Sequence, residues 1–130
     1  MRVQPNVKII TNNPMAQGKY EHFTQFHSCT VEDIFKLARD EIHLGAVIIN
    51  HPLSGSVKPN ESPYKSLVLS TKRGELDVKS LQLIEGALEV LRKMPPRNRV
   101  LPAQAIEDFQ VIDLDLLDSA ITALPAEYHT

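Results

Sequence analysis

The side chains best suited to chemistry gather in one stretch of the chain, His51 to Ser66, which reads HPLSGSVKPNESPYKS. It carries an imidazole, two ammonium groups, four serine hydroxyls, an amide and a phenol. It lies between two apolar runs, 46–49 and 67–69, that we expect to be buried strands. A connection of sixteen residues is long for a compact domain, and such loops are usually functional or disordered. Because its three prolines restrict the backbone, we expect an ordered loop that holds a binding site.

Within this loop, Ser54, Gly55, Ser56 and Lys58 are typical of a small anion cradle. Glycine lets backbone amides turn toward one point, the serines add hydroxyl donors, and lysine supplies positive charge. The spacing is not that of a Walker A loop. The alternative is a tight turn whose serines bond only their own backbone.

His51 directly follows a buried run, where α/β enzymes often place a polar catalytic group. Its imidazole titrates near neutral pH, so it is the candidate general base or anion donor. A structural histidine bonded to a nearby carbonyl is the other interpretation. Asn12 and Asn13 follow the first predicted strand, and they reach the same rim if that strand and 46–50 are parallel neighbours. The expected ligand site therefore comprises Asn12, Asn13, His51, Ser54, Gly55, Ser56, Lys58, Asn60 and Lys65.

The elements that must position these side chains alternate between strand and helix. Strands are predicted at 7–11, 20–26, 46–50, 67–71 and 109–112, from β-branched, alternating or continuously apolar patterns. Helices are predicted from a Thr30 cap to Gly45, from an Asp77 cap to Pro95, and from Asp113 or Asp115 to about residue 122. This order indicates an α/β layered sandwich with a mostly parallel sheet of about five strands and about three helices. The first two strands are expected to pair as a hairpin, because 14–19 is too short for a crossover helix.

Composition bounds the class of protein. The chain has 130 residues, enough for one domain over 1–130, and residues 100–130 carry six acids without Lys or Arg. We expect this acidic strand and helix to belong to the same domain. A net charge of −2 without a clustered basic face argues against nucleic acid, and no apolar run reaches the ~20 residues that cross a membrane.

The single cysteine, Cys29, and the absence of a secretion signal predict a cytoplasmic protein. One cysteine cannot form an intrachain disulfide or a thiolate zinc cluster. The other histidines have no partner at a metal-ligand spacing. We therefore expect no metal and no cofactor.

Four segments together resemble the GrdX family: VKIITNNP, INHPLSGSVKPNESPYKSLVLS, SLQLIEGALEVL and DFQVIDLDLLDSAI. The second is the most specific, and the four cover most of the chain. Proteins of this family are encoded beside components of glycine, sarcosine and betaine reductases in amino-acid-fermenting anaerobes. The resemblance implies a link to reductive amino-acid metabolism but supplies no catalytic residues. One cysteine cannot form a redox-active dithiol, so the resemblance favours an accessory role over a redox component.

Three hypotheses for function remain. The first is a non-catalytic accessory protein whose 51–66 loop binds a small anionic metabolite or a partner such as a reductase-complex component. The second is a small hydrolase or transferase acting on a phosphorylated or acylated metabolite, with His51 as general base and Lys58 as charge stabiliser. The third is a homodimer that pairs through the loop.

Overall fold

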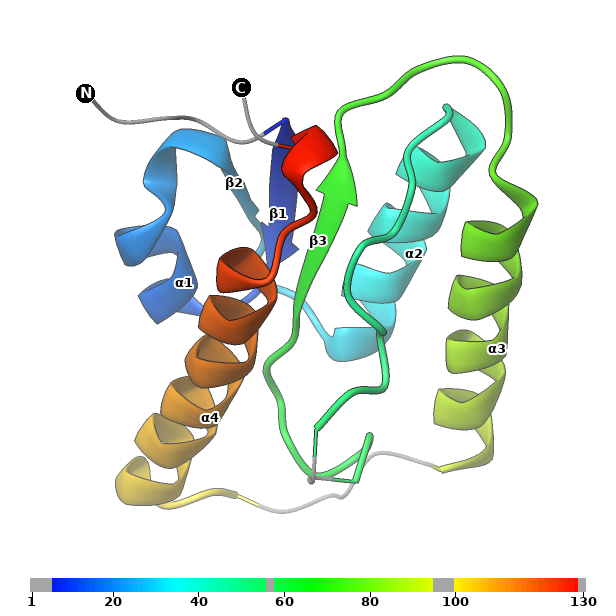
Figure 1. Cartoon of the computed structure of the whole chain (residues 1–130). Helices are drawn as coiled ribbons and strands as arrows, with labels where there is room; N and C mark the ends of the chain where they lie inside the picture. Colours follow the sequence, from blue (N-terminus) through cyan, green and yellow to red (C-terminus); the bar gives the residue numbers. More distant parts are fainter. Residues whose placement is uncertain (1–5, 56–57, 95–99, 129–130) are drawn as a thin grey trace.

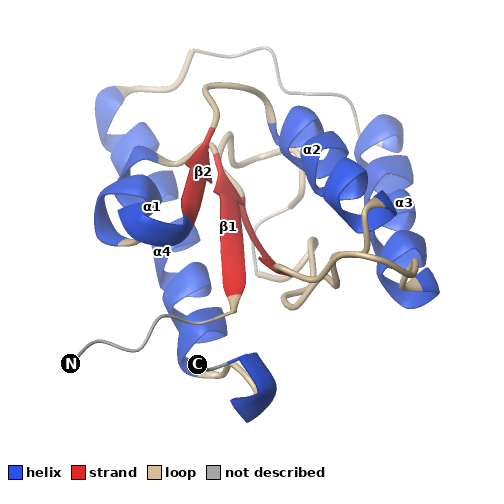
Figure 2. Cartoon of the chain, turned by 90° about the horizontal axis from the view of Figure 1, so that it is seen from above, coloured by secondary structure: helices blue, strands red, loops and turns tan. Residues whose placement is uncertain are grey.

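The computed structural model describes residues 6–55, 58–94 and 100–128. Within these residues, three strands form a sheet that lies between two pairs of helices (Figure 1). Helices α1 (Pro14–Lys19) and α4 (Ala103–Thr122) cover one face, and α2 (Val31–His43) and α3 (Val78–Lys93) cover the other (Figure 2). The layered α/β sandwich is confirmed, but the predicted number of strands is wrong.

The sheet has the order β2-β1-β3 and mixed direction. Its central strand β1 (Val7–Thr11) runs parallel to β2 (Thr24–Phe26) and antiparallel to β3 (Ser66–Ser70). One of the two pairings is therefore antiparallel, and the expectation of a mostly parallel sheet is wrong. The reason is the long loop, which carries no crossover helix and returns the chain beside β1 in the opposite direction.

The predicted strand at 46–50 is only partly formed. It joins β3 through one isolated bridge, between Ile48 and Leu69. The amide of Ile48 donates instead to the hydroxyl of Ser80 in α3, at 2.9 Å. A helix side chain has taken the place of a neighbouring strand, so this segment lies at the edge of the sheet without continuing it.

The first connection is a crossover through a short helix, so the predicted hairpin is wrong. Asn13 caps α1 by accepting a hydrogen bond from the amide of Met15 at 3.0 Å, and Pro14 occupies the first turn. An Asn-Pro pair is a helix-start signal as well as a turn signal. After α1, the 3-10 helix η1 (Glu21–Phe23) takes the first half of the strand predicted at 20–26.

Helices α2 and α3 begin where their caps predict. The Thr30 hydroxyl accepts from the amide of Asp33 at 3.1 Å, and the Asp77 carboxylate accepts from the amide of Ser80 at 3.1 Å. Both helices pack their apolar stripes on one face of the sheet. The core on that face contains Ile10, Phe35, Leu67, Leu69, Ile84 and Leu88.

The predicted strand at 109–112 is wrong, because these residues lie inside α4. Val111 and Ile112 are 42% and 39% exposed, whereas Leu117 is buried against the second face of the sheet. The β-branched residues within 109–112 favour a strand locally, but the packing of the longer apolar stripe of α4 outweighs this preference. The chain then ends its described part in the 3-10 helix η2 (Ala126–Tyr128). Among the described residues, no helix combines the length and apolar character needed to cross a membrane.

Candidate functional site

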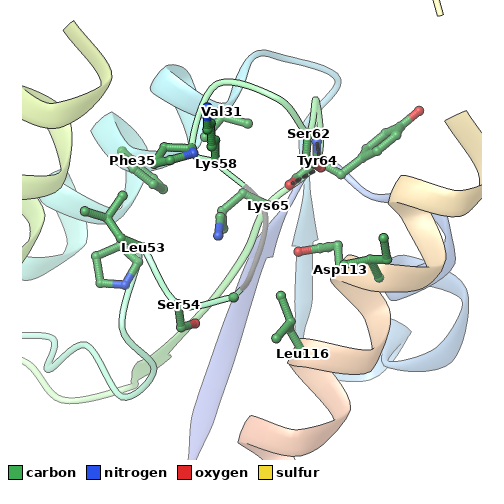
Figure 3. A pocket seen from close by; sticks show the side chains of 14 residues that line it. Val31, Phe35, Leu53, Ser54, Lys58, Ser62, Tyr64, Lys65, Asp113 and Leu116 are labelled. Carbon is green, nitrogen blue, oxygen red and sulfur yellow. Dashed lines mark hydrogen bonds between the residues drawn. The ribbon is translucent and has the colours of Figure 1, made fainter. Parts of the chain in front are cut away.

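A small cavity of about 30 Å³ lies between the long loop, α2 and α4. This volume holds roughly two water molecules or one compact polar group. The figure gives a close view, in which side chains from the loop face α4 across the hollow (Figure 3). The lining residues are Val31, Phe35, Pro52, Leu53, Ser54, Gly55, Lys58, Pro59, Ser62, Tyr64, Lys65, Ile112, Asp113 and Leu116.

Lys65 is the group that defines the chemistry of this cavity. Its half-buried side chain extends into the hollow, and the carboxylate of Asp113 faces it from α4 (Figure 3). Burial lowers the pKa of the Lys65 amine from its usual value, and the Asp113 charge opposes this only in part. In the described part of the chain, neither a hydrogen bond nor an ion pair holds its ammonium. Removing an unpaired charge from water costs free energy. The Lys65 amine is therefore suited to contact a ligand group that is anionic or uncharged.

The Asp113 carboxylate is buried and already satisfied by neutral donors. Its Oδ1 accepts from the amide of Ser66 at 3.0 Å, and its Oδ2 accepts from the Ser66 hydroxyl at 2.6 Å and from Nδ2 of Asn13 at 3.0 Å. The Ser66 and Thr11 hydroxyls lie 2.7 Å apart. These bonds fasten α4 to the ends of β1 and β3, so Asp113 is a fixed wall of the cavity.

The two asparagines of the predicted site lie beside the cavity and organise it. Asn12 donates to the carbonyls of Cys29 and Pro63, both at 2.8 Å, and accepts from the amide of Lys65 at 2.9 Å. It therefore ties the end of the loop to the rim of the sheet. Asn13 is engaged by the α1 cap and by Asp113. The polar atoms of both side chains form hydrogen bonds with other groups of the protein, so both asparagines have positioning roles.

Three of the predicted loop residues, Ser54, Gly55 and Lys58, line the cavity together with Lys65. Gly55 has a φ of +118°, and a Cβ atom there would lie 2.9 Å from a methyl carbon of Leu116. Glycine therefore permits both the backbone turn and the close approach of the loop to α4.

The remaining predicted residues lie elsewhere. Asn60 lines an adjacent open groove of about 640 Å³, formed with the start of α2 and the end of α3. Ser56 lies outside the described residues. His51 is exposed, its Nδ1 accepts from the amide of Leu53 at 3.0 Å, and it is not among the residues that line the cavity. Because His51 does not line this cavity, the cavity lends no support to the general-base hypothesis.

Thiol and metal chemistry find no support at this site. Burial, aided by the charge of Asp33, raises the pKa of the Cys29 thiol, so the sulfur stays protonated and weakly nucleophilic. In the segments that the structure describes, no three side chains of His, Cys, Asp and Glu come together as a metal site. What the cavity offers is amine and ammonium chemistry.

Sequence reasoning missed Asp113 as a site residue. Leu114, Leu117 and Ile121 recur at three- and four-residue spacing and pack against the sheet, and Asp113 precedes Leu117 by one helical turn. A carboxylate within such a stripe signals a buried charge with partners. Ser66 was placed at the end of the loop, although its hydroxyl is the partner that Asp113 needs.

Comparison with known proteins adds the family. A family model described as GrdX-like protein matches residues 8–122, which include the cavity and all four helices of the described chain. No curated protein matches the chain, and no solved structure does. The match spans most of the sequence, and the chain belongs to the GrdX-like family.

Proposed function

We propose that this GrdX-like protein is a non-catalytic accessory protein that binds a small carboxylate in the cavity beneath the 51–66 loop. The link to glycine, sarcosine and betaine reductase systems, and a cytoplasmic setting, are part of this proposal and derive from the family. The observation that carries the binding proposal is the unpaired, half-buried Lys65 ammonium within the described cavity.

The balance of charge supports an anionic ligand. Lys58 and Lys65 line the cavity against the single carboxylate of Asp113, which neutral donors already satisfy. A bound carboxylate would form with Lys65 the ion pair that Asp113 does not provide. Ligand binding would then offset the cost of burying the ammonium.

The size and lining of the cavity favour a compact ligand. Its volume of about 30 Å³ is far below the several hundred Å³ of a typical drug-sized pocket. One face is apolar, formed by Phe35, Leu53 and Leu116, and this suits a short carbon skeleton more than a phosphate with three exposed oxygens. Acetate, glycine and betaine are suitable probes of increasing bulk.

Calorimetric titration and thermal shift with acetate, glycine, betaine, acetyl phosphate and phosphate test the proposal. We expect acetate or glycine to raise the unfolding temperature and to bind one site per chain, with Lys65→Met abolishing the effect. Lys79→Met is the matched control, because Lys79 is an exposed lysine that does not line the cavity. If none of these five compounds raises the unfolding temperature or gives a binding signal, the proposal is overturned.

A further inference from the structure

The two lysines of the cavity differ in environment. Lys58 is exposed, whereas Lys65 is half-buried and lines the cavity together with Phe35, Leu53 and Leu116. An exposed ammonium suits recognition of a carboxylate in water. An amine against an apolar wall is more readily deprotonated, and the neutral amine is the nucleophilic form of lysine.

The carboxylate of Asp113 adds the third element. Its hydrogen bonds from Ser66 and Asn13 hold it in place, and it faces the Lys65 side chain (Figure 3). Both residues line the cavity, which is where a ligand carbon bound to the Lys65 nitrogen would lie. A fixed negative charge at such a place stabilises a cation that forms on that nitrogen.

We infer that Lys65 forms an imine with a small 2-oxo acid or aldehyde acid, and that Lys58 pairs with the ligand carboxylate once the Lys65 nitrogen has bonded to the carbonyl carbon. The inference rests on the proposed function, since it uses the same cavity, and it narrows the ligand from carboxylates in general to those that carry a carbonyl carbon. Glyoxylate and pyruvate are the smallest members of this class and are therefore suitable probes of imine formation.

The reaction balances without a further reactant. The Lys65 ammonium first gives one proton to solvent, and the neutral nitrogen then attacks the carbonyl carbon to form a carbon–nitrogen bond. A proton passes from this nitrogen to the former carbonyl oxygen, giving a neutral carbinolamine. The hydroxyl then takes up the proton that was released to solvent, the carbon–oxygen bond breaks, and the oxygen leaves as water. The product is a protonated imine, which carries the same charge as the original ammonium and faces Asp113.

Borohydride trapping tests the inference in the full-length protein. Glyoxylate is added with and without sodium borohydride, and the adduct is located by intact mass and peptide mapping. We expect one carboxymethyl group, borohydride-dependent, on Lys65, with labelling severalfold above that of the exposed Lys79. Half-maximal labelling of Lys65 is expected at a pH below the usual lysine pKa of 10.5, because burial lowers the pKa of its amine.

Two variants separate this inference from the anion-binding proposal. Lys65→Arg keeps a positive charge but cannot form the imine, so it should lose the adduct and retain acetate binding. Lys58→Ala should reduce labelling of Lys65 by glyoxylate but not by propionaldehyde, which has no carboxylate. Labelling spread evenly over all lysines, with acetate binding intact, would overturn the imine and leave the proposed function standing. If the unmodified protein neither binds acetate nor is labelled selectively at Lys65, the imine and the proposed function are both overturned.

Discussion

Replacing Asp113 by alanine tests whether the wall of the cavity is also the clamp that holds α4 on the sheet. The substitution removes the acceptor for three hydrogen bonds, from the Ser66 amide, the Ser66 hydroxyl and the Asn13 side chain. Asp113 is only 5% exposed, so water reaches these donors poorly after the change. We therefore expect the free energy of unfolding to fall sharply.

The size of the loss follows from the bonds that are broken. A hydrogen bond to a charged group contributes about 1.5–3 kcal/mol, and a buried donor left without a partner costs about 1–3 kcal/mol. These contributions are not additive for neighbours, and the Ser66 hydroxyl can turn toward Thr11, 2.7 Å away. We expect a net loss of about 3–5 kcal/mol, a large share of the 5–15 kcal/mol typical of a domain.

Urea unfolding followed by far-ultraviolet circular dichroism measures this loss. Asp113→Asn should lose less, about 1–3 kcal/mol, because one oxygen still accepts while the amide nitrogen opposes that of Asn13. Asp115→Asn is the control, since Asp115 lies exposed on the same helix. If Asp113→Ala costs no more than Asp115→Asn, the clamp does not exist as we describe it.

Three further predictions concern the cavity and its surroundings. Lys65→Met should raise the free energy of unfolding at neutral pH. This gain in stability over the unmodified protein should shrink as the pH rises toward the usual lysine pKa of 10.5, because the unfolded chain holds the Lys65 proton to higher pH than the folded protein does. A gain that urea unfolding shows to be independent of pH would contradict this. Gly55→Ala should cost about 1–3 kcal/mol and weaken acetate binding in calorimetry, because of its positive φ and the close leucine of α4. The control Gly86→Ala, in α3 with open space around it, should be neutral or stabilising in the same assay. Tyr20→Phe loses a 2.5 Å bond to Asp118 and should cost about 1 kcal/mol in urea unfolding. Since burial and Asp118 raise the pKa of the phenol, this difference should hold below pH 10.0 and shrink above it, and a difference that grows there would refute the assignment.

Much of the architecture around α2 and α3 was predictable because it depends on local signals. Thr30 and Asp77 cap their helices as expected, and the apolar stripes of both helices face the core. Capping and helical periodicity act over a few residues, so they can be recognised without knowledge of the fold. The position of the candidate site in the 51–66 loop follows from the same kind of local reasoning.

The errors lie where distant contacts outweigh local preference. Residues 109–112 have strand character, yet they belong to a helix whose stripe runs through Leu114 and Leu117. The direction of β3 depends on how the loop returns to β1, which no local pattern encodes. Strand pairing is specified by long-range contacts and is therefore the part least accessible to sequence reasoning.

For the site, the sequence by itself determined the inventory: a proline-restricted loop with Gly55, Lys58 and Lys65, and membership of the GrdX-like family. Only the tertiary structure decided which of these groups meet. It brought Asp113 from α4 to face Lys65, turned Asn12 into an anchor for the loop, and left His51 exposed. The physical reason is that burial and hydrogen bonding between distant segments govern the charge and reactivity of a lysine, and both arise only when the chain has folded.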